Sequence, residues 1–178
     1  MSRDPGPMRA ALTLARRRLG LTWPNPSVGC VIVKDRVVIG RGATQRGGRP
    51  HAETVALAQA GKAAKGATAY VTLEPCSHHG KTPPCAEALI ASGVARVIVA
   101  AQDPDPRVSG KGIAALRAAG IEVELGLCAA EAEEVNAGFF TLMRLGRPMV
   151  TLKVAASLDG QPASVRFAKR FPQGTYRI

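Results

Sequence analysis

Three residues of this 178-residue chain have the types and the spacing of zinc ligands: His51, Cys76 and Cys85. Imidazole and thiolate are ligands that zinc prefers, and a set of three leaves the fourth tetrahedral position open. An open position is typical of catalytic zinc, which lowers the pKa of a water bound there toward neutrality. The sequence therefore predicts a catalytic zinc site with these three residues as its ligands.

Glu53 follows His51 by two residues, at the start of a predicted helix. Its side chain leaves the backbone in a different direction from that of His51, so it need not bind the metal. A carboxylate beside the reacting water can accept a proton and deliver it to a departing amine. A non-ligand Glu between the His and the two cysteines is the arrangement found in zinc nucleobase deaminases. We therefore expect Glu53 to be the general base and acid.

The residue types alone leave two other interpretations open. A structural zinc site would need a fourth protein ligand, which His78, His79 or Cys30 could supply. Alternatively, the cysteines are buried thiols that bind no metal. Cys30 lies in a β-branched run and is expected in the core, and Cys128 is expected in the core or on the surface.

The segments around these residues show strand and helix patterns in alternation. Two β-branched runs separated by the polar residues 34–36 predict a hairpin. Helices are predicted over 7–19, 51–60, 86–92, 111–119 and 129–145, and further strands over 68–73, 96–101 and 121–126. From residue 68 onward this alternation predicts a parallel sheet covered on both faces. The expected fold is a three-layer α/β/α sandwich with a mixed, largely parallel sheet.

The composition restricts the classes of partner. The net charge is +11, but the basic residues are scattered, and aromatic residues that could stack on bases make up only 4%. This pattern favours a basic surface or an anionic small substrate over a nucleic acid. No apolar run reaches the roughly 18 residues that a membrane span needs. The N-terminus lacks a secretory pattern, so the four cysteines are expected to stay reduced in the cytoplasm.

Several motifs together carry a family resemblance. They are NPSVGCVIV, HAE, YVTLEPCSHHGKTPPC, RVIVAAQDPDPRVSGKG and AGIEVELG. Over roughly residues 8–163 the chain resembles the deaminase domain of the bacterial bifunctional riboflavin-biosynthesis deaminase/reductase. Eight residues separate Cys76 from Cys85, where cytidine and tRNA adenosine deaminases usually have two, and this longer loop is typical of the riboflavin branch.

The resemblance implies a cytidine deaminase-like fold and a zinc-dependent hydrolase of riboflavin biosynthesis. The implied reaction converts 2,5-diamino-6-ribosylamino-4(3H)-pyrimidinone 5′-phosphate to 5-amino-6-ribosylaminouracil 5′-phosphate and ammonia. The alternatives are a tRNA adenosine or cytidine deaminase, and an inactive zinc-stabilised remnant. The expected partner is thus a small phosphorylated pyrimidine, with neither nucleic acid nor membrane, and homo-oligomerisation is left open.

The resemblance also implies four substrate contacts. Asn25 matches the family's pocket asparagine, whose amide can both donate to and accept from a pyrimidine edge. His78 and Lys81 fall where the family contacts the ribose-phosphate, and a cation there suits an anionic substrate. Asp103 matches a further substrate contact of the family. These four residues are therefore the expected substrate-binding set.

Two positions depart from the family pattern. Thr44 stands where a His is often found, and Asp105 stands where the family usually has Asn. A carboxylate near a phosphate is unfavourable unless it points away or meets Lys81 or Arg107. The departures therefore concern phosphate binding and leave the deamination chemistry unchanged.

The predicted domain organisation has three parts. Residues 1–147 form the deaminase domain, 148–163 resemble the start of a reductase domain, and 164–178 form an unmatched basic tail. In the family the reductase domain is much longer and binds NADPH. We therefore expect zinc to be the only cofactor of this chain, expect no reductase activity from it, and expect residues 150–178 to be poorly ordered or packed opportunistically.

Overall fold

The computed structural model describes residues 4–78 and 83–153. The chain divides into two units, Met1–Pro148 and Met149–Ile178. All the helices and strands described belong to the first unit, and the described residues of the second have neither. The expected reductase remnant, the basic tail and the expected poor order of the C-terminal residues fall largely outside the described residues and stay predictions.

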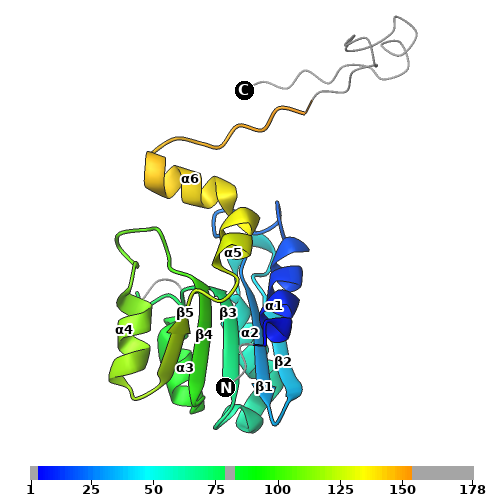
Figure 1. Cartoon of the computed structure of the whole chain (residues 1–178), viewed down its shortest axis with the longest axis vertical. Helices are drawn as coiled ribbons and strands as arrows, with labels where there is room; N and C mark the ends of the chain where they lie inside the picture. Colours follow the sequence, from blue (N-terminus) through cyan, green and yellow to red (C-terminus); the bar gives the residue numbers. More distant parts are fainter. Residues whose placement is uncertain (1–3, 79–82, 154–178) are drawn as a thin grey trace, which may run out of the picture. The chain divides into compact units, whose positions relative to one another are not determined.

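A five-stranded sheet forms the centre of the first unit (Figure 1). Its strands are β1 (Gly29–Lys34), β2 (Val37–Ala43), β3 (Thr68–Leu73), β4 (Arg96–Ala101) and β5 (Glu122–Leu125). Across the sheet they lie in the order β2-β1-β3-β4-β5. Strand β1 pairs antiparallel with β2 and β3, whereas β3, β4 and β5 pair in parallel. Because only β1 runs against the others, the predicted mixed, largely parallel sheet is confirmed.

Helices cover both faces of this sheet. They are α1 (Gly6–Arg16) and α5 (Ala129–Val135) on one face, and α2 (Ala52–Ala60), α3 (Cys85–Ser92) and α4 (Lys111–Ala118) on the other. The alternation of β1 shows the division, since Val31 packs under the first group and Ile32 under the second. The three-layer sandwich is therefore confirmed. No helix in the described part of the chain is long and apolar enough to cross a bilayer.

Two glycines of strand β2 allow helix α2 to lie directly on it. A Cβ atom at Gly40 would be 2.3 Å from the carbonyl oxygen of Ala56, and one at Gly42 would be 2.2 Å from that of Ala52. Any side chain at either position would collide with helix backbone, which cannot move aside as a flexible side chain would. Backbone contact therefore sets the height of the start of α2 above the sheet.

The prediction of a single helix over residues 129–145 is wrong. The segment forms α5 and α6 (Ala137–Leu145), which are separated at Asn136. The Asn136 amide accepts the backbone N–H of Ser27 at 2.8 Å and donates to its carbonyl oxygen at 2.9 Å. Asn136 has the non-helical angles φ −112° and ψ 29°. Its buried side chain thus bonds to the backbone of the loop before β1, and the helix is interrupted where this contact forms.

The loops that carry most of the predicted site residues meet at one edge of the sheet. Cys76 follows β3 and Asp103 follows β4, at the carboxyl ends of two neighbouring parallel strands. Asn25 precedes β1 and Thr44 follows β2, and the antiparallel pairings of β1 bring both to this same edge. Short helical turns η1 (Arg46–Gly48) and η2 (Gly61–Ala64) flank α2. The fold therefore converges on a single edge, where a site can form.

Candidate active site

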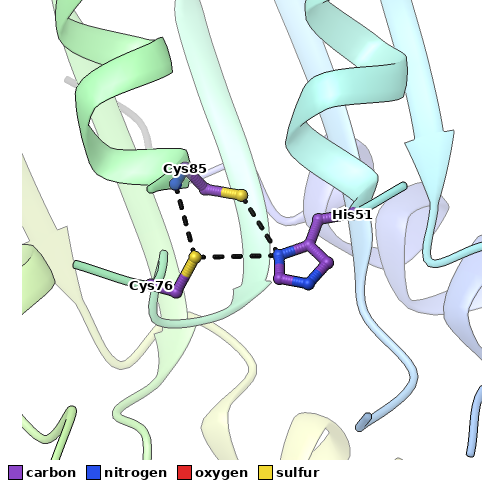
Figure 2. A group of neighbouring side chains, drawn as sticks. All are labelled: His51, Cys76 and Cys85. Atoms are coloured by element: carbon purple, nitrogen blue, oxygen red, sulfur yellow. Dashed lines mark hydrogen bonds between the residues drawn. The ribbon is translucent and has the colours of Figure 1, made fainter. Parts of the chain in front are cut away.

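His51, Cys76 and Cys85 come together at this edge with their ligand atoms facing one another (Figure 2). His51 Nδ1 lies 3.3 Å from Cys85 Sγ and 3.7 Å from Cys76 Sγ. Two ligands of one tetrahedral zinc ion, at the usual bond lengths, lie about 3.5 Å apart. The donor types and their separations therefore fit a zinc ion, with these three residues as the groups that would hold it.

Each of the three groups is fixed by the start or end of an element. His51 is the residue before the first turn of α2, Cys76 follows β3 by three residues, and Cys85 is the first residue of α3. The backbone N–H of Cys85 donates to Cys76 Sγ at 3.3 Å. A helix start supplies unpaired N–H groups and partial positive charge, which stabilise a thiolate. The start of α3 thus favours the thiolate form of Cys76.

The two thiols differ in acidity. The pKa of Cys76 is lowered to about 4, because the Cys85 thiol donates a hydrogen bond to it and His51 adds a second stabilising interaction. The pKa of Cys85 is raised by that same hydrogen bond and by burial. The pKa of His51 is raised, mainly by its hydrogen bond with Cys76. The lowered pKa of Cys76 favours its thiolate form, which is the form that binds metal ions.

Glu53 lies beside this trio but outside it. Only 3% of its surface is exposed, and burial raises its pKa to about 7. The negative charge of Cys76 raises this pKa further, and a hydrogen bond with Cys85 lowers it. A carboxyl group with a pKa near neutrality exchanges protons readily at physiological pH. The geometry therefore agrees with the expected proton-carrying role.

A cavity of about 280 Å³ opens next to the trio. Its wall contains His51, Cys76 and Glu53 together with residues of the loops before β1 and after β2, β3 and β4. Three of the four expected substrate contacts, Asn25, His78 and Asp103, line it as well. The fourth, Lys81, lies outside the described residues. The cavity thus gathers every described residue that the sequence placed in the pocket.

Asn25 lies in the cavity wall beside His51 of the donor trio. Its Nδ2 atom donates to the carbonyl oxygen of Gly48 at 2.8 Å and lies 3.3 Å from His51 Nε2. Gly48 has a φ of +83°, and a Cβ atom there would be 2.8 Å from Asn25 Nδ2. Gly48 is therefore needed where the η1 turn approaches Asn25, and the turn holds the amide at the cavity wall.

The two departures from the family pattern have a structural account. The Thr44 hydroxyl accepts the backbone N–H of Val28 at 3.0 Å, so this buried side chain connects β2 to the start of β1. Asp105 binds Arg107 through several bonds, the shortest being 2.6 Å from the guanidinium. This pairing lowers the pKa of Asp105. Arg107 is thus the partner that balances the additional carboxylate.

Sequence reasoning missed part of the cavity wall. Arg49 lines it from the loop before His51, and α6 contributes Phe139, Leu142 and Met143. Phe139 is partly buried, and Leu142 is 45% exposed. The break at Asn136 redirects this helix, and only the Asn in mid-pattern could have indicated it. The part of the wall that α6 contributes is therefore apolar.

We expect the Asp103→Asn substitution to stabilise the protein at pH 8 by about 1 kcal/mol. Burial, followed by the charges of Asp105 and Glu74, raises the pKa of Asp103 to about 6. Because this folded-state pKa exceeds the ordinary value, ionised Asp103 costs stability above pH 6, and the cost fades as the pH falls toward 4. Urea denaturation at pH 5 and pH 8 measures the difference. The exposed Glu134→Gln serves as the control and should have wild-type stability. An Asp103→Asn protein less stable than wild type at pH 8 would contradict the prediction.

Comparison with known proteins gives an independent view of the site. A model of the cytidine and deoxycytidylate deaminase zinc-binding region matches residues 1–101. Riboflavin biosynthesis protein RibD of Escherichia coli K12 is 60% identical over 156 residues, which are 88% of this chain and 42% of that protein. The chain therefore spans a little under half the length of this relative.

A shorter relative matches almost end to end. The diaminohydroxyphosphoribosylamino-pyrimidine deaminase of Buchnera aphidicola subsp. Schizaphis graminum is 50% identical over 141 residues, covering 79% of this chain and 96% of that protein. Among solved structures, Acinetobacter baumannii RibD superimposes with a TM-score of 0.87 at 53% identity, covering 97% of this chain and 48% of that one. Sequence and structure comparisons thus agree on one group of relatives.

Proposed function

Because the chain belongs to the cytidine and deoxycytidylate deaminase zinc-binding family, in the branch of the riboflavin-biosynthesis deaminases, we propose that it is a zinc-dependent pyrimidine deaminase. The family resemblance predicted from the motifs is confirmed. The proposed reaction consumes water, releases the 2-amino group of 2,5-diamino-6-ribosylamino-4(3H)-pyrimidinone 5′-phosphate as ammonia, and leaves 5-amino-6-ribosylaminouracil 5′-phosphate. The observation that carries it is a buried, non-ligand Glu53 beside a His-Cys-Cys trio at the wall of a cavity.

Zinc, when bound by His51, Cys76 and Cys85, supplies a Lewis acid that makes water reactive at neutral pH. Glu53 takes one proton from the attacking water and passes it to the pyrimidine ring, and it then carries the second proton, from the hydroxyl group formed by the attack, to the departing amine. Its pKa of about 7 suits both steps, because the group must accept and release a proton at the same pH. The buried position keeps bulk water away from this transfer.

Different residues of the cavity wall are proposed to bind the base, the ring face and the ribose-phosphate of the substrate. We assign the Asn25 amide to the base and the apolar Phe139 and Leu142 to the ring, since all three line the cavity. His78 and Arg107, which also line it, are proposed to contact the ribose-phosphate. Since Arg107 already neutralises Asp105, that carboxylate does not oppose the phosphate. Lys81 is proposed as an additional phosphate contact.

The proposal is limited to the deaminase step, since the short relative that matches almost end to end is named for that step alone. We place the reaction in the cytoplasm, because Cys76 and Cys85 would have to stay reduced to bind a metal. Neither a nucleic acid nor a membrane is part of the proposed reaction.

The test is an ammonia-release assay on the purified chain with the diaminopyrimidine nucleotide, run with and without a chelator. We expect release from the nucleotide, its loss after chelation, and its recovery when zinc is returned. Cytidine and tRNA are assayed in parallel as competing substrates. Release from either of these but not from the nucleotide would contradict the substrate assignment. A zinc-loaded chain that releases ammonia from none of them would be an inactive remnant.

A further inference from the structure

Glu74 is a buried carboxylate that the proposed chemistry does not use. It directly follows β3, stands two residues before Cys76, and is only 4% exposed. Its two oxygens accept four backbone N–H groups. These donors are Asp103 at 3.2 Å and Gly110 at 2.9 Å to Oε2, and Gly112 at 2.9 Å and Ile113 at 3.1 Å to Oε1. All four belong to the loop after β4 or to the start of α4.

Backbone N–H groups bind the oxygens of this buried carboxylate. In residues 4–78 and 83–153, no Lys or Arg forms an ion pair with Glu74. A buried carboxylate is costly unless its oxygens are hydrogen-bonded, so removing the loop from Glu74 would leave the charge uncompensated. The loop conformation and the buried charge therefore depend on each other.

A glycine completes this connection from the other side. A Cβ atom at Gly112 would lie 1.9 Å from the carbonyl oxygen of Pro75. The start of α4 therefore rests on the backbone of the residue between Glu74 and Cys76. The backbone of the segment that carries Cys76 thus contacts the backbone at the start of α4.

Helix capping alone does not account for the contacts of Glu74. Gly112 and Ile113 are in the first turn of α4, and a carboxylate bonded to them is an ordinary helix cap. The bond from Asp103 comes from the far end of the loop, directly after β4. Oxygen Oε2 thus ties Asp103 and Gly110, the two ends of the loop, to one point.

This loop carries residues that face the cavity. Asp103 and Asp105 both line it, and Asp103 Oδ1 accepts the backbone N–H of Asp105 at 2.9 Å. Asp105 in turn accepts the backbone N–H of Arg107 at 2.9 Å. Starting from Glu74, successive carboxylates therefore accept backbone N–H groups along the loop, and each bond fixes the next residue at the cavity wall.

We propose that Glu74 is a positioning residue that aligns the substrate-binding loop at residues 103–110 with the segment carrying Cys76. Through this alignment Asp103 is presented to a substrate held at the metal. The role deepens the proposed function and rests on it, since the loop is taken to contact that substrate. Glu74 lines the cavity but is not in the donor trio, and both of its oxygens are occupied by backbone N–H groups.

A graded pair of substitutions tests the proposal. Glu74→Gln keeps one carbonyl oxygen for two of the donors, but its amide group opposes the other two, whereas Glu74→Ala loses all four bonds. We expect KM for the diaminopyrimidine nucleotide to rise about threefold in the first and about tenfold or more in the second. The fall in kcat should be smaller than the rise in KM, and zinc content should equal that of wild type. The exposed Glu134→Gln serves as the matched control.

Gly112→Ala provides a second variant that leaves the carboxylate in place. Its methyl group would push the start of α4 away from Pro75, so the same rise in KM with unchanged zinc content is expected. A purely structural role would lower the melting temperature of these variants without changing KM below it. Folded, zinc-loaded Glu74→Ala with a wild-type KM would overturn the proposal.

Amide hydrogen exchange separates this proposal from the proposed function. In Glu74→Ala, the amides of Asp103 and Gly110 should exchange at least about tenfold faster, while amides of β3 and β4 keep their protection. This readout needs no substrate. If wild type fails to deaminate the nucleotide but these two amides exchange faster in Glu74→Ala, the proposed function is wrong and the positioning role of Glu74 is supported. Unchanged exchange at both loop amides would overturn the alignment, whatever the activity.

Discussion

The Glu53→Gln protein is expected to bind one zinc ion per chain and to release ammonia at least about 1,000-fold more slowly than wild type. Glutamine has nearly the same shape but cannot carry a proton between water and the departing amine. Since Glu53 lies outside the donor trio, its loss should not remove the metal. Steady-state kinetics and metal analysis on the same preparation give both quantities.

Stability supplies an internal control for this variant. The pKa of Glu53 is raised to about 7, mainly by burial, so its ionised form costs stability above pH 7 in the metal-free protein. Glutamine removes that cost, and the metal-free variant should therefore unfold at the same or a higher denaturant concentration than wild type at pH 8. Glu134→Gln controls for the loss of an exposed carboxylate. Wild-type turnover in Glu53→Gln would show that another group carries the proton.

Replacing Cys76 by serine is expected to remove zinc and to reduce ammonia release to the level of the blank. A serine hydroxyl does not ionise near neutral pH, whereas the pKa of Cys76 is lowered to about 4 by the hydrogen bond from Cys85 and by His51. The site would therefore lose its thiolate, and two remaining ligands bind zinc weakly. Metal analysis after dialysis measures the loss, and added zinc should not restore activity.

Cys128→Ser is the matched control for this substitution. Cys128 is also a free cysteine and is only partly buried, but it precedes α5 and is not in the donor trio. It should keep its zinc and its activity. Cys85→Ser should behave as Cys76→Ser does. If Cys76→Ser retained a full zinc equivalent with wild-type turnover, the ligand assignment would be wrong.

The sequence was sufficient to predict the donor trio and the sandwich that positions it. His51, Cys76 and Cys85 each stand where a helix or strand begins or ends, and such junctions are marked by local patterns. The β-branched runs gave the strands because a buried strand needs little beyond apolar, branched side chains. These features depend on neighbours in the sequence, and they could therefore be predicted.

Contacts between distant segments could not be predicted in this way. The bonds between Asn136 and Ser27 join residues that lie 109 positions apart, and they break a helix whose apolar pattern continues unchanged. The four donors to Glu74 likewise come from beyond β4, and a Glu before a Pro-Cys pair gives no sign of them. The apolar side of the cavity depends on the first of these contacts, so it too was missed.

The contact of α2 with two glycines of β2 restricts which substitutions this fold can accept over evolutionary time. The helix that begins beside His51 rests on the backbone of β2 at Gly40 and Gly42, so its height above the sheet depends on two residues without side chains. A side chain at either position would therefore displace the start of α2 and, with it, Glu53 in the first turn of that helix. Over evolutionary time these two positions are expected to stay glycine, although neither belongs to the donor trio.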